Sequence, residues 1–94
     1  MKRDEQGYRH FRQVIDETPK EVKTQIRWQF DIADIIYRRL KELKITQKEF
    51  AKLMHTSPAC VNRWVGGGQN FTISTLAKIS TVLEIPLITI NKQI

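Results

Sequence analysis

The chain has 94 residues, 40% of them hydrophobic, which predicts one domain with a modest core, too small for the deep pocket that most metabolic enzymes need. Its net charge of +6 suits a polyanionic partner, and its single cysteine, Cys60, excludes an internal disulfide and fits a reducing cytosol. No apolar run approaches the ~20 residues of a membrane span and residues 1–10 lack the apolar stretch of a signal peptide, so we expect a soluble, cytoplasmic protein with no membrane partner.

The N-terminal segment, residues 1–17, is expected to be flexible or to form one short helix outside the main domain. Residues 1–7 are rich in charge, whereas Tyr8, Phe11 and Ile15 fall three to four positions apart, which is the spacing of one helix face. If the segment is ordered, these three side chains predict a short amphipathic helix.

A long helix is predicted to open the main domain, residues 18–94. Thr18-Pro-Lys-Glu21 has the pattern of a capping box with proline at the first helical position. The helix should run for roughly 25 residues, with a break near Phe30 as the alternative. Its apolar period is Val22, Ile26, Phe30, Ala33, Tyr37, Leu40 and Leu43. Because this helix is longer than an ordinary domain uses, its first half is available to cover something else, such as a partner.

Two short helices joined by a tight turn are predicted over residues 46–64. The first begins with Thr46-Gln-Lys-Glu49, a capping box in which the hydroxyl and the carboxylate each accept from the other residue's backbone amide. Its apolar face is expected to be Phe50, Ala51, Leu53 and Met54. His55 and Thr56 form the turn, where histidine tolerates a left-handed conformation.

The second short helix begins at Ser57 and Pro58, an N-cap followed by a residue whose missing N–H does no harm in the first turn. Val61 and Trp64 lie three positions apart and should turn inward. The positions left facing outward are Ala59, Asn62 and Arg63. The predicted core residues are Phe50, Val61, Trp64 and Leu76, with Cys60 at the edge.

A glycine-rich loop and a further helix complete the pattern. Residues 66–70, Gly-Gly-Gly-Gln-Asn, begin without side chains, which lets backbone amides approach phosphates closely. Thr72 should cap a helix through Leu83, which Ile85-Pro86 should end. Residues 87–90, Leu-Ile-Thr-Ile, favour a short strand that either packs as a hydrophobic plug or pairs with a second copy, and we favour the pairing.

Residues 38–85 resemble the helix-turn-helix domain of the phage-repressor family, the Cro/C1 or XRE type. The resemblance rests on the residue types at Thr46, Gln47, Glu49, Phe50, Ala51, Leu53, Ser57, Val61, Arg63, Trp64, Phe71 to Ile73 and Thr75 to Ile79. Leu40 and Val65 stand where the family often pairs an Arg with a Glu, and His55 stands where it often has Gly. Apolar residues often replace a buried ion pair at no loss, so the fold is still expected.

The resemblance implies an all-α, phage-repressor-like helix-turn-helix bundle with an N-terminal helical extension and a short C-terminal strand or tail. It also implies a sequence-specific DNA-binding transcriptional regulator that acts as a homodimer on double-stranded operator DNA. The expected DNA-contacting residues are Thr46, Gln47, Ser57, Pro58, Ala59, Asn62, Arg63, Gly67, Gln69 and Asn70.

Arg63 is the strongest candidate for base reading, because Arg commonly contacts guanine O6 and N7; the alternative is a surface Arg lying over Trp64. Asn62 either reads adenine or contacts a phosphate. Pro58 and Ala59 cannot hydrogen-bond through their side chains, and methyl contact with thymine is the alternative left to them. We therefore expect fewer direct base contacts and more reliance on phosphate contacts and DNA shape.

Phosphate contacts are expected at the beginnings of the two motif helices. Thr46 and Ser57 are helix caps, and a cap hydroxyl lies beside free amides at the positive end of the helix dipole. Gln47 matches a position that contacts the DNA backbone in the family.

More narrowly, NFTISTLAKI and the preceding PKEV-type helix are similar to bacterial antitoxins of the host-inhibition-of-growth (HigA) kind. That resemblance implies neutralisation of a ribonuclease-type toxin together with repression of the protein's own operon; the alternative is a stand-alone repressor with no toxin partner. The expected partner-binding residues are Tyr8, Phe11, Ile15, Val22, Ile26 and Trp28. The same segment could instead pack on the core or across a dimer. The sequence has no acid–base pair, nucleophile triad, phosphate loop or metal-ligand cluster, so we expect no enzymatic activity, metal or cofactor.

Overall fold

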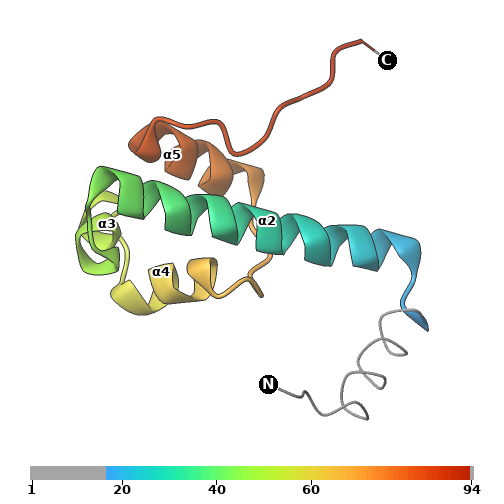
Figure 1. Cartoon of the computed structure of the whole chain (residues 1–94), viewed down its shortest axis with the longest axis horizontal. Helices are drawn as coiled ribbons and strands as arrows, with labels where there is room; N and C mark the ends of the chain where they lie inside the picture. Colours follow the sequence, from blue (N-terminus) through green and yellow to red (C-terminus); the bar gives the residue numbers. More distant parts are fainter. Residues whose placement is uncertain (1–16, 94) are drawn as a thin grey trace, which may run out of the picture.

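The computed structural model describes residues 17–93, and four α-helices form the fold in that range (Figure 1). They are α2 (Lys20–Leu43), α3 (Gln47–Leu53), α4 (Pro58–Val65) and α5 (Ile73–Leu83). α4 and α5 contact α2 from opposite sides, and α3 packs against α4 near the end of α2 (Figure 1). Residues 17–93 contain no strand, so the fold is all-α as predicted. None of the helices in this range has the length and apolar character needed to cross a membrane.

The long helix α2 is continuous over 24 residues, so the predicted single helix is confirmed and the alternative break near Phe30 is absent from it. The predicted Thr18 capping box is wrong, because Pro19 is the N-cap residue and no side chain caps the helix. Pro19 has extended backbone angles, φ −55° and ψ 148°, and its carbonyl accepts from the Val22 amide at 3.0 Å. The proline therefore precedes the first turn of the helix instead of forming part of it.

The buried face of α2 differs from the predicted one. Its core residues are Ile32, Ala33, Ile36 and Leu40. The predicted period contained Ala33 and Leu40, but its exposed members are Val22, Phe30, Tyr37 and Leu43. The reason is that α2 carries two apolar rows, and the core uses the row that contains Ile32 and Ile36. All the buried residues lie in the second half of α2, and the first half extends beyond the other helices (Figure 1).

One hydrophobic core joins the four helices. Its largest fully buried side chains are Phe50, Ile36, Ile79, Leu83 and Val61. The Phe50 and Trp64 rings meet edge to face with their centroids 6.1 Å apart. The predicted core residues Phe50, Val61, Trp64 and Leu76 are all buried, and Cys60 packs at the edge as predicted. The prediction for Leu53 is wrong: α3 is short, its inward side is filled by Phe50, Ala51 and Met54, and the Leu53 side chain is 53% exposed.

Two cationic side chains bind the ends of neighbouring helices. Arg39 of α2 donates from Nε to the Leu83 carbonyl, and Lys78 of α5 donates from Nζ to the Met54 carbonyl, both at 2.8 Å. Leu83 is the last residue of α5 and Met54 is the C-cap of α3. Each cation therefore satisfies a carbonyl that a helix leaves free at its end, and the two bonds tie α2 to α5 and α5 to α3.

The C-terminal tail first packs on the core and then leaves it. Leu87 is buried, and its backbone amide donates to Ser80 Oγ at 3.1 Å. Residues 88–93 form neither helix nor strand and run away from the helices, with Ile88 and Ile90 exposed (Figure 1). Leu87 thus behaves as the predicted plug. The predicted strand is not formed within residues 17–93, where the tail has no neighbouring strand to pair with, and pairing with a second copy stays a prediction.

Candidate nucleic-acid interface

The first motif helix, α3, is fixed at its beginning by a reciprocal pair of hydrogen bonds. The Thr46 hydroxyl accepts from the Glu49 amide at 3.0 Å, and the Glu49 carboxylate accepts from the Thr46 amide at 3.2 Å. The predicted capping box is confirmed. It holds the first turn of α3, which carries the half-buried Gln47 and the exposed Lys48, at the protein surface.

The turn between α3 and α4 is short and closed by backbone bonds. His55 has a φ of 55°, so the left-handed conformation predicted for this histidine is confirmed. The Thr56 amide then donates to the Ala51 carbonyl at 2.9 Å, which closes the end of α3. The chain can therefore begin α4 only two residues later, and the two helices remain packed against each other.

The second motif helix, α4, begins as predicted. The Ser57 hydroxyl accepts from the Cys60 amide at 3.1 Å, and Pro58 occupies the first helical position. One side of α4 is bound to the core, because Val61 is fully buried and Trp64 is 7% exposed. The exposed side chains of α4 are Pro58, Ala59, Asn62 and Arg63. The predicted division of α4 into an inner and an outer side is therefore confirmed, and we call these four residues the α4 outer face.

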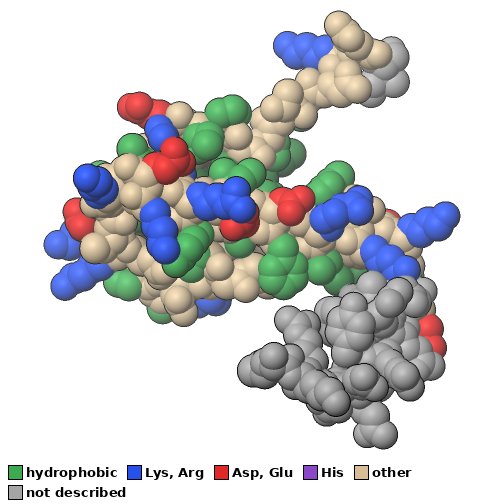
Figure 2. Space-filling view, viewed as in Figure 1, with side chains coloured by type: hydrophobic (Ala, Val, Ile, Leu, Met, Phe, Trp, Pro, Cys, Tyr) green, Lys and Arg blue, Asp and Glu red, His purple; other side chains and the backbone are tan. Residues whose placement is uncertain are grey.

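The charges around the motif are mainly positive. Arg63 is the charged residue of α4, and α3 adds the exposed Lys48 and Lys52. None of these three cations makes an ion pair within residues 17–93, where the described ion pairs join Asp34 to Arg38 and Arg39 to Glu42. Figure 2 shows Lys and Arg side chains at the end of the molecule where α3 and the end of α2 lie. Cations free of intramolecular partners are available to phosphates.

The loop after α4 contains a glycine with a packing role. Gly67 is buried and has a φ of 88°, and a Cβ built on it would lie 2.5 Å from Cδ1 and Cε1 of Phe30. Any other residue here would be strained in its backbone and would collide with the ring. At Gly68, by contrast, a Cβ would meet nothing within 4 Å. The contact with the Phe30 ring therefore explains why position 67 is a glycine, and this explanation does not involve DNA. Phe30 itself belongs to the row of α2 that was wrongly predicted to face the core.

Most of the predicted DNA-contacting residues come together on the motif. Thr46, Gln47, Ser57 and the α4 outer face lie at the beginnings and along the outside of α3 and α4, and Gln69 and Asn70 lie in the loop that follows. All ten predicted residues are at least partly exposed except Gly67. Lys48 and Lys52 are additional surface cations of α3. Each lies two positions from the apolar Phe50 and therefore on the opposite side of the helix, and this spacing was the signal available in the sequence.

Only some of the predicted partner-binding residues lie within the part of the chain that the structure describes. Val22 and Trp28 lie on the first half of α2 and are 37% and 62% exposed, and Ile26 beside them is half-buried. Tyr8, Phe11 and Ile15 lie outside the described residues.

Comparison with known families gives one match. The family model HTH_3, described as Helix-turn-helix, matches residues 36–90, which is more than half of the chain and includes α3, α4 and α5 entirely. Neither curated proteins nor solved structures give a significant match to the chain.

Proposed function

We propose that this chain, which belongs to the Cro/C1-type helix-turn-helix family of DNA-binding transcription regulators, represses transcription by binding an operator through α4. The observation that carries the proposal is the α4 outer face, because a short helix whose opposite side is held by Val61 and Trp64 presents these side chains rigidly. The major groove of B-DNA admits such a helix, and base edges there are distinguishable by hydrogen bonding. The family is a DNA-binding family and not an enzymatic one.

Arg63 is proposed as the main base-reading residue, since a guanidinium can donate to O6 and N7 of guanine together. Asn62 on the same face would read adenine or contact a phosphate. Pro58 and Ala59 offer only apolar contact, which suits a thymine methyl group. A face with two polar readers leaves part of the specificity to DNA shape.

Phosphate contacts would come from the surroundings of the α4 outer face. The Ser57 hydroxyl lies at the beginning of α4, where backbone amides and the helix dipole favour a phosphate. Gln47, Lys48 and Lys52 lie on α3, which packs against α4, and are exposed or half-buried. Such contacts fix the register of the protein on the duplex without reading its sequence.

We further propose that two copies bind one operator. One short helix reads only ~4 to 5 base pairs, and two helices held one helical turn of DNA apart, about 34 Å, read two half-sites at once. We propose the exposed tail residues Ile88 and Ile90 or the exposed first half of α2 as the apolar surfaces that join the copies. We propose that the protein acts in the cytoplasm.

Selection of a preferred duplex from random-sequence DNA with the full chain tests this function. The affinity for the selected duplex is compared with that for a scrambled duplex of equal length at the same salt concentration. We expect the selected duplex to bind at least ~10³-fold more tightly, as specific regulators do. Equal affinities would mean that the protein binds DNA only non-specifically, and the proposed function would be rejected.

A second candidate function is that of an antitoxin, which would neutralise a ribonuclease-type toxin by covering it. The observation that favours it is that the family match begins at residue 36, whereas α2 begins at Lys20 and exposes Val22 and Trp28 before the match. Exposed aromatic and apolar side chains on a helix are typical of an interface core. A stand-alone repressor would have no need of this extension.

Co-expression with a candidate toxin identified from the neighbouring reading frames tests the antitoxin role. The variant Trp28→Glu should lose neutralisation of that protein while it keeps operator binding. Leu43→Glu is the matched control, because Leu43 is a 40% exposed apolar residue at the other end of the same helix. Equal neutralisation by both variants and the unchanged chain would remove the first half of α2 from the proposed interface.

A further inference from the structure

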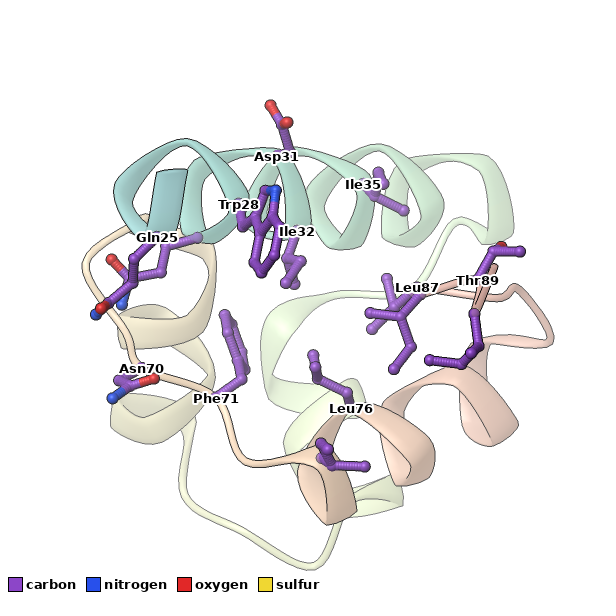
Figure 3. A pocket seen from close by; sticks show the side chains of 14 residues that line it. Gln25, Trp28, Asp31, Ile32, Ile35, Asn70, Phe71, Leu76, Leu87 and Thr89 are labelled. Carbon is purple, nitrogen blue, oxygen red and sulfur yellow. The ribbon is translucent and has the colours of Figure 1, made fainter. Parts of the chain in front are cut away.

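Helix α5 contacts the rest of the molecule in several places. Its beginning, with Ile73 and Leu76, forms one wall of an apolar groove of about 530 Å³ between α2, α5 and the C-terminal tail (Figure 3). Its last carbonyl, that of Leu83, accepts from Arg39 of α2. From its middle, Lys78 reaches the end of α3, the first helix of the motif. Of these contacts, the one from Lys78 is made to the part of the molecule that is proposed to bind DNA.

The Lys78 ammonium group binds the peptide unit at which α3 ends. Its Nζ donates to the Met54 carbonyl at 2.8 Å, across 24 positions of sequence. Met54 is the C-cap residue of α3, and the same peptide unit carries the His55 amide, which donates to the Lys52 carbonyl at 3.1 Å. Both polar groups of this peptide unit are therefore bonded, one to α3 itself and the other to α5.

This peptide unit comes directly before the strained residue of the turn. His55 has a φ of 55°, a left-handed conformation that costs free energy for a residue with a side chain. The Thr56 amide then donates to the Ala51 carbonyl, and Ser57 caps α4. A rotation at His55 would change the direction in which α4 leaves α3. The hydrogen bond from Lys78 opposes that rotation, because it fixes the peptide plane that precedes His55.

We infer that Lys78 is a positioning residue for sequence-specific DNA binding, because it holds the turn between α3 and α4 and thereby the angle of the α4 outer face. The inference rests on the proposed function of α4. A lysine suits this task, since its ammonium group is attracted to the negative end of the α3 dipole and donates to a carbonyl that the helix leaves free. Without this bond, Asn62 and Arg63 would lose their fixed direction relative to the phosphate contacts of α3. Base contacts require that register, whereas phosphate contacts carry no sequence information.

A direct phosphate contact is the other role open to Lys78. Lys48 of α3 is the reference for that role, because it is exposed, its ammonium group makes no hydrogen bond or ion pair within residues 17–93, and it is proposed to contact phosphate. The Lys78 ammonium group, by contrast, is held against Met54 in a partly buried bond. The two roles predict different binding data, because a phosphate contact strengthens binding to every duplex alike and adds about 0.9 to the salt slope.

The variants Lys78→Met and Lys48→Met, which remove one charge each, are compared on the selected operator and on random-sequence DNA at several salt concentrations. Circular dichroism identifies a temperature at which every variant is folded, so that a loss of stability alone leaves the ratio of the two affinities unchanged. We expect Lys78→Met to lower that ratio about tenfold, as the loss of a base contact would, and to leave the salt slope unchanged. Lys48→Met should weaken both duplexes alike and reduce the slope by about 0.9. Lys78→Arg keeps a cationic donor and should restore most of the ratio.

A second background tests whether Lys78 acts through the turn. Glycine adopts a positive φ without the cost that His55 bears, so the turn should depend less on Lys78 in a His55→Gly chain, and Lys78→Met should lower the ratio less there. An unchanged ratio in Lys78→Met, equal losses in the two backgrounds, or the pattern of Lys48→Met would overturn the inference. A Lys78→Met chain that is unfolded in both backgrounds would also overturn it, because Lys78 would then serve stability alone. A lack of preference for any duplex in the unchanged chain would instead reject the proposed function, and the inference with it.

Discussion

At the scale of single residues, recognition of the operator's base sequence is expected to depend most on the Arg63 side chain. It is exposed on α4 and does not belong to the hydrophobic core, so its removal should leave the fold intact. We expect Arg63→Ala to weaken operator binding by roughly 1 to 3 kcal/mol and to affect random DNA less. Fluorescence anisotropy with both duplexes measures the two effects. An unchanged preference for the operator would mean that the base-reading face has been assigned wrongly.

Lys52 provides the contrasting case on α3. It is exposed and makes no ion pair within residues 17–93, so a role in DNA binding would be with phosphate. Lys52→Ala should weaken binding to operator and random DNA alike and reduce the steepness of the salt dependence by about one. The same anisotropy titrations test this. A loss confined to the operator would show that Lys52 reads bases.

Most residue types with a local role were predicted well from the sequence, with the Thr18 capping box as the exception, and contacts between residues far apart in the sequence were not predicted. Some features depend only on the neighbouring backbone, so a short stretch of sequence is enough to predict them. They are the caps at Thr46 and Ser57 and the left-handed conformation of His55. Gly67 was predicted to let the backbone approach phosphate, which stays a prediction, and its positive φ and contact with Phe30 were not predicted. Phe30 is 37 positions away in the sequence, and no local pattern indicates such a neighbour.

At the scale of elements, the contact between α2 and the loop after α4 should be measurable as stability. Gly67→Ala introduces a Cβ at a φ of 88° against the Phe30 ring, so we expect it to lower the free energy of unfolding by about 1 to 3 kcal/mol. Gly68→Ala is the control and should change it by less than about 0.5 kcal/mol, because the space there is open. Urea unfolding measures both.

The part of this loss that comes from the ring can be separated by a double-mutant cycle. In a Phe30→Ala background the collision is removed and only the backbone strain at Gly67 remains, so Gly67→Ala should cost less there. Equal losses in the two backgrounds would show that Phe30 does not restrict this position. Equal losses for Gly67→Ala and Gly68→Ala would contradict the packing role altogether.

The length of α2 was predictable and its buried side was not. Helical spacing and the absence of internal breakers indicate one helix of about this length, which the structure confirms. Two apolar rows run along it, however, and the choice between them depends on where α4 and α5 lie. That information is not local, so the row with Phe30 and Tyr37 was chosen although the core uses Ile32 and Ile36. The apolar groove between α2, the beginning of α5 and the C-terminal tail was not predicted for the same reason, since its walls come from three separate parts of the chain.

At the scale of the whole molecule, we expect a homodimer. Two copies of α4 must be held in register to read two half-sites, and the exposed tail is a candidate seam because its backbone is not paired within the described chain. Sedimentation of the free protein at tens of micromolar should give twice the mass of one chain. The change Ile90→Glu should shift the equilibrium towards monomer if the tail is the seam. A strict monomer that still binds a single half-site would contradict the dimer.

The central claim, that this protein acts by docking on DNA, is tested most directly by the salt dependence of its binding to the selected operator. The chain has a net charge of +6, and its motif presents cations and helix caps to phosphates. Each phosphate contact releases a counterion, so the logarithm of the binding constant should fall linearly with the logarithm of salt concentration, by about 0.9 for each contact. We predict a steep negative slope that corresponds to several contacts. A slope near zero would contradict the claim.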